Sequence, residues 1–153
     1  MLKSKIILLT GGAEGIGWEC AKAYDNNGAI VCIADKNPVI AQKQSELKGE
    51  HVCMLCDVTN EQNIIEAIET ITHTFGRLDA IHNNAGIVHP SKPLHDTSDD
   101  EWNLLLNVNL KSILFTTRHG IGHLKKSKGT ILNTSSVVGT IGQDSHAAYA
   151  ATK

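Results

Sequence analysis

The sequence predicts an α/β protein with a doubly wound parallel sheet of five strands. Two observations lead to this fold class. Short apolar runs rich in Val, Ile and Leu alternate with segments of helical period, which is the pattern of right-handed βαβ units. The first of these runs is followed directly by a glycine-rich turn that opens a helix. We expect residues 1–153 to form a single domain, because domains of about 100 to 150 residues are the commonest size.

The expected strands are short and apolar, which suits a sheet that is covered on both faces. They occupy residues 5–10, 29–35, 51–56, 79–83 and 129–135. The spacing of apolar residues between these strands predicts helices, at residues 15–27, 38–47, 60–75 and 99–124. A last helix begins near Ala147.

Several element boundaries carry a physical signal. Asn60 is placed to cap the third helix with its side-chain oxygen, and Glu61 lies in the positive first turn of that helix. Gly28 and Gly76 each follow a helical segment, as C-terminal stops do. Residues 89–98 contain two prolines and several polar side chains, so we expect a loop there.

The composition limits the classes of partner. The chain is 41% hydrophobic and 20% charged, with a net charge of −2, so it has no field that would attract nucleic acid or anionic lipid. Its apolar runs, such as residues 6–9, fall short of the roughly 20 residues of a membrane helix and the roughly 7 to 15 of a secretion-signal core. We therefore expect a small-molecule partner, with no nucleic-acid or membrane partner.

The cysteines and histidines do not predict a metal site. Cys53 and Cys56 have the Cys-x-x-Cys spacing that can bind metal or perform redox chemistry, but residues three apart in a strand point to opposite faces of the sheet. His119 and His123 share a helix face without an obvious third ligand. We expect no metal, and we expect all four cysteines to be the reduced thiols of a cytoplasmic protein.

The glycine-rich turn spans Thr10-Gly11-Gly12-Ala13-Glu14-Gly15-Ile16-Gly17. Glycines let the backbone approach a pyrophosphate, and the helix that follows offers unpaired N–H groups to phosphates; an ordinary strand-to-helix turn is the alternative. The spacing resembles the Thr-Gly-x-x-x-Gly-Ile-Gly of the short-chain dehydrogenase/reductase family, whose fold is Rossmann-like. It differs from the Thr-Gly-x-x-Gly-x-x-Gly typical of the related extended enzymes. The cofactor-binding residues expected here are Gly11, Glu14, Gly15, Ile16 and Gly17.

Asp35 ends the second expected strand, eighteen residues beyond Gly17. A carboxylate in this register can accept hydrogen bonds from the adenosine ribose and would repel a 2′-phosphate; capping of the strand is the alternative. Glu14 adds a second negative charge where NADP-preferring members of the family often carry a basic residue. Both charges favour NAD, and Lys36 is the one contrary sign.

Two further segments match the family after the third and fourth expected strands. Asp57-Val58 corresponds to the pair that meets the adenine ring in the family. Asn83-Asn84-Ala85-Gly86 matches the family's Asn-Asn-Ala-Gly, where small residues let the backbone pass close to the cofactor and Asn side chains can tie strands together. The resemblance implies cofactor contacts from Asp57, Val58, Asn83, Ala85 and Gly86.

Tyr149 and Lys153 lie four residues apart, hence on one helix face, although many surface helices carry such a pair without chemistry. A free phenol has a pKa of about 10, and a neighbouring cation stabilises its phenolate. The resemblance implies that Tyr149 transfers the substrate proton and that Lys153 tunes Tyr149 and anchors the nicotinamide ribose. It also implies that Ser136, with Ser135 as its rival, orients the substrate oxygen, and that Asn109 completes a proton relay.

The resemblance therefore implies an oxidoreductase that transfers hydride between NAD(H) and a secondary alcohol or ketone. The alternatives are a noncatalytic NAD-binding fragment without a substrate site and an extended-family epimerase or dehydratase. Family members usually continue with two further strands, so we expect the sequence to be part of a longer enzyme. An open fifth strand would favour a homo-oligomer. The identity of the substrate does not follow from the sequence.

Overall fold

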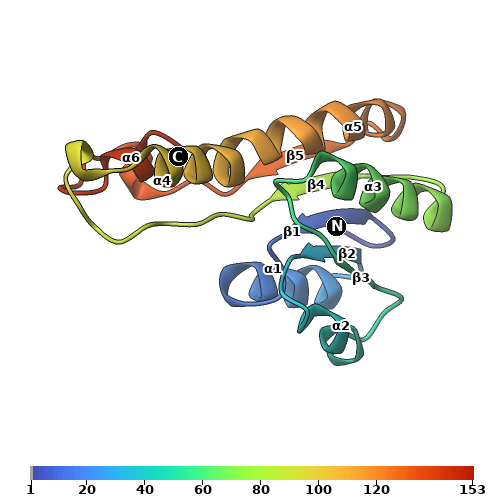
Figure 1. Ribbon diagram of the computed structural model, residues 1–153. Helices are drawn as coiled ribbons and strands as arrows, with labels where there is room; N and C mark the ends of the chain where they lie inside the picture. Colours follow the sequence, from blue (N-terminus) through green and yellow to red (C-terminus); the bar gives the residue numbers. More distant parts are fainter. Residues whose placement is uncertain (1) are drawn as a thin grey trace.

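The computed structural model describes residues 2–153, and its five strands form one parallel sheet. The strands lie in the order β3-β2-β1-β4-β5 (Figure 1). Their bounds are β1 Ile6–Thr10, β2 Ile30–Asp35, β3 Val52–Leu55, β4 Ala80–Asn83 and β5 Thr130–Asn133. The chain builds the sheet outward from β1 in one direction and then returns to the other side of β1. The predicted doubly wound α/β fold is confirmed.

The sheet positions a crevice between β1 and β4. In the register, Leu9 pairs with Ile33 of β2 on one side and with His82 of β4 on the other. Because the strand order reverses at β1, the loops after β1 and β4 leave the sheet toward opposite faces. Ligands of open α/β sheets bind beyond the carboxyl ends of the strands at this position.

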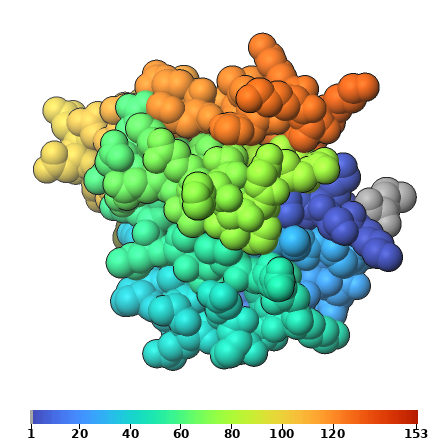
Figure 2. All heavy atoms as spheres, turned by 90° about the vertical axis from the view of Figure 1, so that its right-hand side faces the viewer, coloured from blue at the N-terminus to red at the C-terminus, as the bar shows by residue number. Residues whose placement is uncertain are grey.

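Helices cover both faces of the sheet (Figure 1). On one face lie α1 (Gly15–Asn26) and the short α2 (Ile40–Lys43), and on the other lie α3 (Glu61–Phe75) and α5 (Ser112–Ser127). The space-filling view shows the orange segment that ends α5, the green segment that ends α3 and the blue-to-teal N-terminal segments as adjoining bands (Figure 2). Within residues 2–153, none of the helices is long and apolar enough to cross a membrane.

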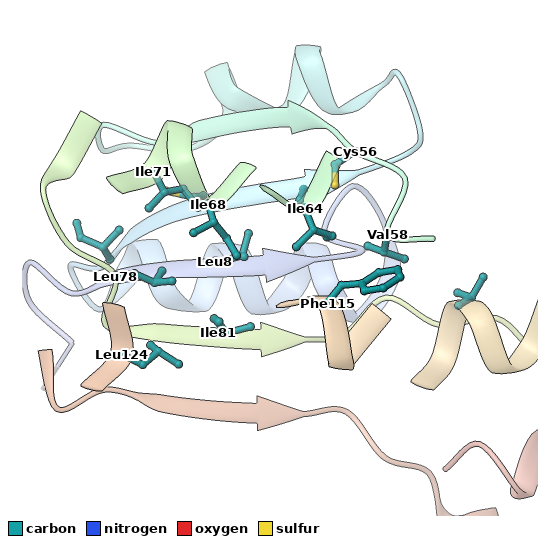
Figure 3. Packing of buried hydrophobic residues seen from close by; sticks show 14 residues of the cluster. Leu8, Cys56, Val58, Ile64, Ile68, Ile71, Leu78, Ile81, Phe115 and Leu124 are labelled. Atoms are coloured by element: carbon teal, nitrogen blue, oxygen red, sulfur yellow. The ribbon is translucent and has the colours of Figure 1, made fainter. Parts of the chain in front are cut away.

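Each face of the sheet carries its own apolar core. Ile64, Ile68 and Ile71 of α3 and Phe115 of α5 pack against Leu8 (Figure 3). On the opposite face, α1 and α2 pack against β1 and β2, and this core contains Leu9, Ala13, Trp18, Ala21, Val31, Ile33, Ile40 and Leu47. Successive strand residues thus point to opposite faces, as a sheet covered on both sides requires.

The predicted helix signals take the expected form. The Asn60 side chain accepts a hydrogen bond of 3.0 Å from the Gln62 N–H, and Glu61 lies in the first turn of α3. Gly76 ends α3 with a φ of +71°, and Gly28 follows α1 with a φ of +79°. These left-handed conformations favour glycine, because a Cβ is strained there.

Two predicted helices differ from the expectation. The helix expected at residues 38–47 is only α2 and a 3₁₀ turn, Gln44–Glu46. The helix expected at residues 99–124 is divided into α4 (Asp99–Leu106) and α5 by the π-helical turn Asn107–Lys111. The last helix, α6, spans Ala147–Ala150, and further 3₁₀ turns lie at Leu94–Asp96 and Val137–Gly139. A π turn inserts one residue without changing the apolar spacing enough to be visible in the sequence.

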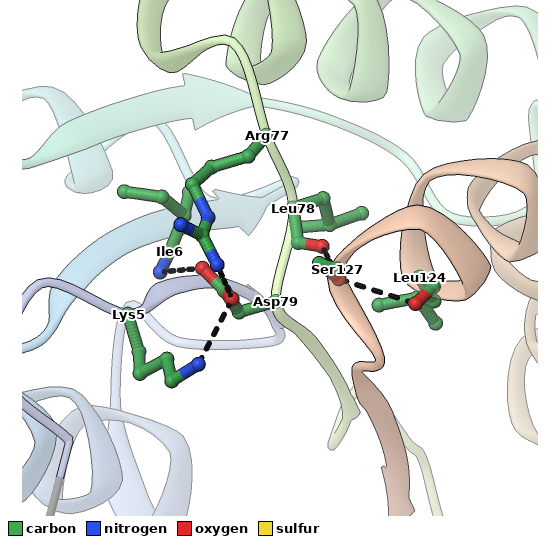
Figure 4. Close-up of polar contacts among 7 residues, drawn as sticks. All are labelled: Lys5, Ile6, Arg77, Leu78, Asp79, Leu124 and Ser127. Carbon is green, nitrogen blue, oxygen red and sulfur yellow. Dashed lines mark hydrogen bonds and ion pairs between the residues drawn. The ribbon is translucent and has the colours of Figure 1, made fainter.

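A buried carboxylate stabilises the amino end of the sheet (Figure 4). Asp79 accepts hydrogen bonds from the Ile6 N–H and the Lys5 ammonium at 3.0 and 3.2 Å, and it pairs with the Arg77 guanidinium. Burial alone would raise the pKa of Asp79, but these donors hold it below its usual value. The charged carboxylate of Asp79, the residue before β4, therefore holds this end of β4 against β1.

Cys53, Cys56 and His119 make packing and hydrogen-bond contacts within the fold. Cys56 lies in the core under α3, whereas Cys53 packs against the core on the opposite face. Burial raises the pKa of each thiol to about 11, which disfavours the thiolate that binds metals. His119 bonds to Glu61 at 2.8 Å. Residues 2–153 contain no cluster of three or more His, Cys, Asp or Glu side chains that would hold a metal ion.

Candidate active site

A cleft of about 540 Å³ opens at the carboxyl ends of the strands. Its walls are the loops that follow β1, β2, β3, β4 and β5, together with α6. The cleft brings together most of the residues predicted from the sequence, namely Gly11, Glu14, Ile16, Gly17, Asp35, Asp57, Val58, Ala85, Gly86, Ser136, Tyr149 and Lys153.

The glycine-rich turn is packed so closely that side chains are excluded. A Cβ on Gly11 would lie 2.6 Å from the Ala85 Cα, and one on Gly17 would lie 2.0 Å from the Gly11 carbonyl oxygen. Gly15 does not line the cleft, but its φ of +54° favours glycine. Within the described residues, no side chain caps α1, and Ile16 and Gly17 of its first turn line the cleft.

Thr10 joins this turn to the loop after β4. Its Oγ1 accepts hydrogen bonds of 3.2 Å from the N–H groups of both Asn84 and Ala85. The Asn84 side chain in turn donates to the Gly11 carbonyl at 2.9 Å. The two loops on either side of the crevice are therefore held at a fixed separation.

Asp35 lies at the opening of the cleft, next to the glycine-rich turn. Its carboxylate accepts hydrogen bonds of 2.9 Å from the Ala13 N–H and the Asn37 N–H, one on each oxygen. Because a carboxylate oxygen has two lone pairs, both oxygens keep capacity to accept from a ligand. Glu14 is exposed beside it and accepts from the Asn37 side chain at 3.3 Å, while Lys36 also lines the cleft.

Asp57 and Val58 continue this wall after β3. One oxygen of Asp57 accepts from the Thr59 N–H at 2.9 Å and from the Thr59 hydroxyl at 2.8 Å. These bonds fix the turn and leave the second oxygen at the exposed rim. Val58 is buried and contributes an apolar side chain to the cleft.

Asn83 does not line the cleft. Its side chain is 5% exposed, donates to the Asn133 side chain at 2.8 Å and accepts from the Thr116 hydroxyl at 2.7 Å. The expected tie between strands is present, and the contact of Asn83 with a cofactor stays a prediction. Neighbouring residues of a strand point to opposite sides, and it is Asn84 that lines the cleft.

Lys153 and Tyr149 lie together on α6 and the turn that follows it. The Lys153 Nζ lies 5.8 Å from the centre of the Tyr149 ring and donates to the Thr134 carbonyl at 3.2 Å. A Cβ on Gly86 would lie 3.1 Å from this Nζ, so glycine leaves room for the amine. Burial lowers the pKa of Lys153.

The two candidate serines have different surroundings. The Ser135 hydroxyl donates to the main-chain carbonyl of Lys153 at 3.1 Å. No hydrogen bond within residues 2–153 engages the hydroxyl of Ser136, which is half-buried in the cleft. Ser136 is therefore the serine whose hydroxyl is available to a ligand.

Asn109 lies in the π turn, behind the cleft rather than in its wall. Its side chain exchanges two hydrogen bonds of 2.9 Å with the main chain of Ile87 and donates to the Thr152 hydroxyl at 2.8 Å. Thr152 donates onward to the Tyr149 carbonyl at 2.7 Å. Asn109 thus fixes the loop after β4 against α6. Sequence reasoning did not identify Thr152, which is 3% exposed.

Comparison with known proteins places this geometry in a family. The model of the short chain dehydrogenase family matches residues 5–153. The chain belongs to the short-chain dehydrogenase family. This finding confirms the resemblance seen in the motifs, and members of this family use nicotinamide cofactors.

Several members of the family are similar to this chain over nearly its whole length. The L-fucose dehydrogenase of Bos taurus is 39% identical over 150 residues, which are 97% of this chain and 55% of that protein. The cyclopentanol dehydrogenase of a Comamonas strain is 38% identical over 157 residues, covering 99% of this chain and 62% of that protein. The chain therefore spans little more than half the length of these short-chain dehydrogenases.

A solved short-chain dehydrogenase structure has the same fold. The 3-ketoacyl-(acyl-carrier-protein) reductase of Brucella melitensis, crystallised in complex with NADH, matches with a TM-score of 0.94 and 28% identity. The match covers 99% of this chain and 65% of the reductase chain.

Proposed function

We propose that residues 1–153 are the dinucleotide-binding and catalytic domain of an NAD(H)-dependent dehydrogenase that interconverts a secondary alcohol and a ketone. The observation that carries the proposal is the shared cleft, which joins the glycine-rich turn of α1 to Ser136, Tyr149 and Lys153. A noncatalytic nucleotide-binding module would need the turn but not these three side chains.

The cleft fits a dinucleotide. The absent Cβ atoms of Gly11 and Gly17 keep the backbone close-packed beneath the first turn of α1, whose N–H groups suit a pyrophosphate. Asp35 retains lone pairs for ribose hydroxyls, and Glu14 adds negative charge beside it. A 2′-phosphate would be repelled there, which supports NAD over NADP in spite of Lys36.

Each side chain in the cleft has a separate role in the proposed acid–base chemistry. A bound nicotinamide would supply the site that accepts or returns the hydride. Tyr149 removes the proton from the substrate hydroxyl, or returns it to the ketone oxygen, while the Lys153 ammonium stabilises the phenolate. Ser136 donates a hydrogen bond to the same oxygen and stabilises its negative charge. Asn109 holds Tyr149 and Lys153 in place through Thr152.

The names of the relatives support a class of substrate. Two similar proteins are named for their substrates, L-fucose and cyclopentanol. Both compounds contain a ring carbon with a hydroxyl group. We propose a small alcohol or carbonyl compound as the substrate and no metal in the chemistry.

Leu110, Leu114 and Ile121 are exposed along α5 and the preceding turn, which supports a homo-oligomer. The four cysteines form no disulfide within residues 2–153, which supports the proposal of a cytoplasmic location.

The test is turnover by the purified protein with NAD and a panel of secondary alcohols, followed as NADH absorbance. Tyr149→Phe removes the proton-transferring group and is expected to lower kcat by at least about 100-fold while the Kd for NADH stays within threefold. Undiminished turnover in this variant would refute the role of Tyr149. NADH binding without turnover in the parent would favour a noncatalytic module, and product without net NADH would favour an epimerase or dehydratase.

A further inference from the structure

A buried imidazole lies one residue before the end of β4, and the proposed mechanism does not use it. His82 of β4 is 5% exposed and faces α1, on the side of the sheet opposite to the α5 contact of Ile81. Burial lowers the pKa of His82, so the neutral ring is favoured. Both of its nitrogens nevertheless have partners at hydrogen-bond distance.

The partners of His82 come from two separate elements. The Nδ1 atom lies 3.0 Å from the hydroxyl of Tyr24 on α1, and the Nε2 atom lies 3.0 Å from the hydroxyl of Thr134, just after β5. The Thr134 hydroxyl also lies 3.2 Å from the Asn84 Oδ1. Asn84 completes the chain of contacts by donating to the Gly11 carbonyl at 2.9 Å.

The direction of every bond in this chain is fixed by its last member. The Gly11 carbonyl can only accept, so the Asn84 amide nitrogen faces it and the amide oxygen must accept from Thr134. Thr134 has then used its one proton, so it accepts from the Nε2–H of His82. The unprotonated Nδ1 finally accepts from the Tyr24 hydroxyl. Of the two neutral tautomers of His82, only the Nε2–H form satisfies all of these bonds.

Thr134 is also the residue that holds the catalytic amine, because its carbonyl accepts the 3.2 Å hydrogen bond from Lys153 Nζ. We propose that His82 is a positioning residue for Lys153: its Nε2–H holds Thr134, and the Thr134 carbonyl holds the Lys153 amine in the cleft. This inference rests on the proposed function. It assigns a role to the Tyr24–His82–Thr134 contacts, which link the helix of the glycine-rich turn to the catalytic amine.

Two amide substitutions test the two hydrogen bonds of His82 separately. In His82→Gln the amide nitrogen occupies the Nε2 position and still donates to Thr134, while the bond with Tyr24 is lost. In His82→Asn the amide group occupies the Nδ1 position and still accepts from Tyr24, while Thr134 is released. Each variant loses one buried hydrogen bond, so a merely structural role predicts similar losses of stability and activity in both.

The experiment measures kcat and KM for a secondary alcohol with NAD, together with the thermal unfolding of each variant. We expect His82→Asn to lower kcat about tenfold, because small misplacements of a catalytic group are costly, and His82→Gln to stay within threefold of the parent. KM for the alcohol stays within about threefold in both variants, because substrate-binding groups are untouched. Equal kcat in the two variants would overturn the proposal.

Nuclear magnetic resonance tests the role of His82 independently of turnover. The ¹⁵N shifts of His82 are expected to report a neutral Nε2–H tautomer, and an Nδ1–H tautomer would overturn the assigned direction. In ¹⁵N-lysine protein, His82→Asn is expected to shift the Lys153 amine resonance and His82→Gln to leave it in place; the reverse would overturn the proposal. A parent protein that turns over no alcohol refutes the proposed function alone, since these resonances still decide the role of His82.

Discussion

Two glycines in the same helix are predicted to respond in opposite directions to alanine. Gly122 of α5 has no atom within 4 Å of the position where a Cβ would lie. Alanine there gains helix propensity and should raise the free energy of unfolding by about 0.8 kcal/mol. At Gly120 the added Cβ would lie 2.4 Å from the Ile81 Cδ1. Ile81 is fully buried, and overpacking such a core costs about 1–3 kcal/mol.

The propensity gain of about 0.8 kcal/mol applies equally to both sites, so Gly120→Ala should be destabilised by about 1 kcal/mol net and should lie about 2 kcal/mol below Gly122→Ala. Urea unfolding followed by circular dichroism measures both values from the shift in midpoint at constant slope. Ile81→Val removes the clashing Cδ1 and should recover part of the loss in a double variant. Equal stability of the two alanine variants would refute the close packing of α5 on β4.

The remaining predictions concern single side chains. Asp79→Ala should lower the free energy of unfolding by about 2–3 kcal/mol at neutral pH, because the buried Ile6 N–H loses its acceptor. The folded-state pKa of Asp79 is lowered, so its contribution is present above the unfolded pKa of about 3.9 and is lost as the pH falls below that value; a constant difference in urea midpoint from pH 7 to pH 3 would contradict this role. Cys56, which is 2% exposed and has a thiol pKa of about 11, should react with a thiol reagent at pH 7 only on unfolding, and rapid labelling of Cys56 in the native protein would contradict its burial. His51→Ala should destabilise the protein by about 1–3 kcal/mol, because the Val31 N–H loses its buried acceptor, and an unchanged urea midpoint would show that this bond contributes nothing.

The sequence predicted the fold because its signals are local. Five apolar runs, the cap at Asn60 and the stop at Gly76 each depend on a few neighbouring residues, and all five strands formed where they were expected. The glycine-rich turn was equally predictable from the sequence, because a close approach of two backbone segments leaves no room for a Cβ at Gly11 or Gly17. The residues gathered in the cleft follow from their places at the ends of parallel strands.

The remaining features of the site depend on partners that are distant in sequence. His82 and Thr134 are separated by 52 residues, and Asn109 and Thr152 by 43, so neither pair carries a local signal. The Asn-Asn-Ala-Gly motif did not predict which asparagine lines the cleft. The Asn83 side chain bonds to Asn133, and Asn84 lines the cleft.

The proposed function requires that a nicotinamide cofactor binds in the cleft beside Tyr149 and Lys153. The most direct measurement is the crystal structure of the protein with NADH. We expect the pyrophosphate at the first turn of α1, the adenosine ribose at Asp35 and the nicotinamide ring beside Tyr149 and Lys153. Ordered NADH bound away from this cleft, or a nicotinamide ring out of reach of the Tyr149 hydroxyl, would contradict it.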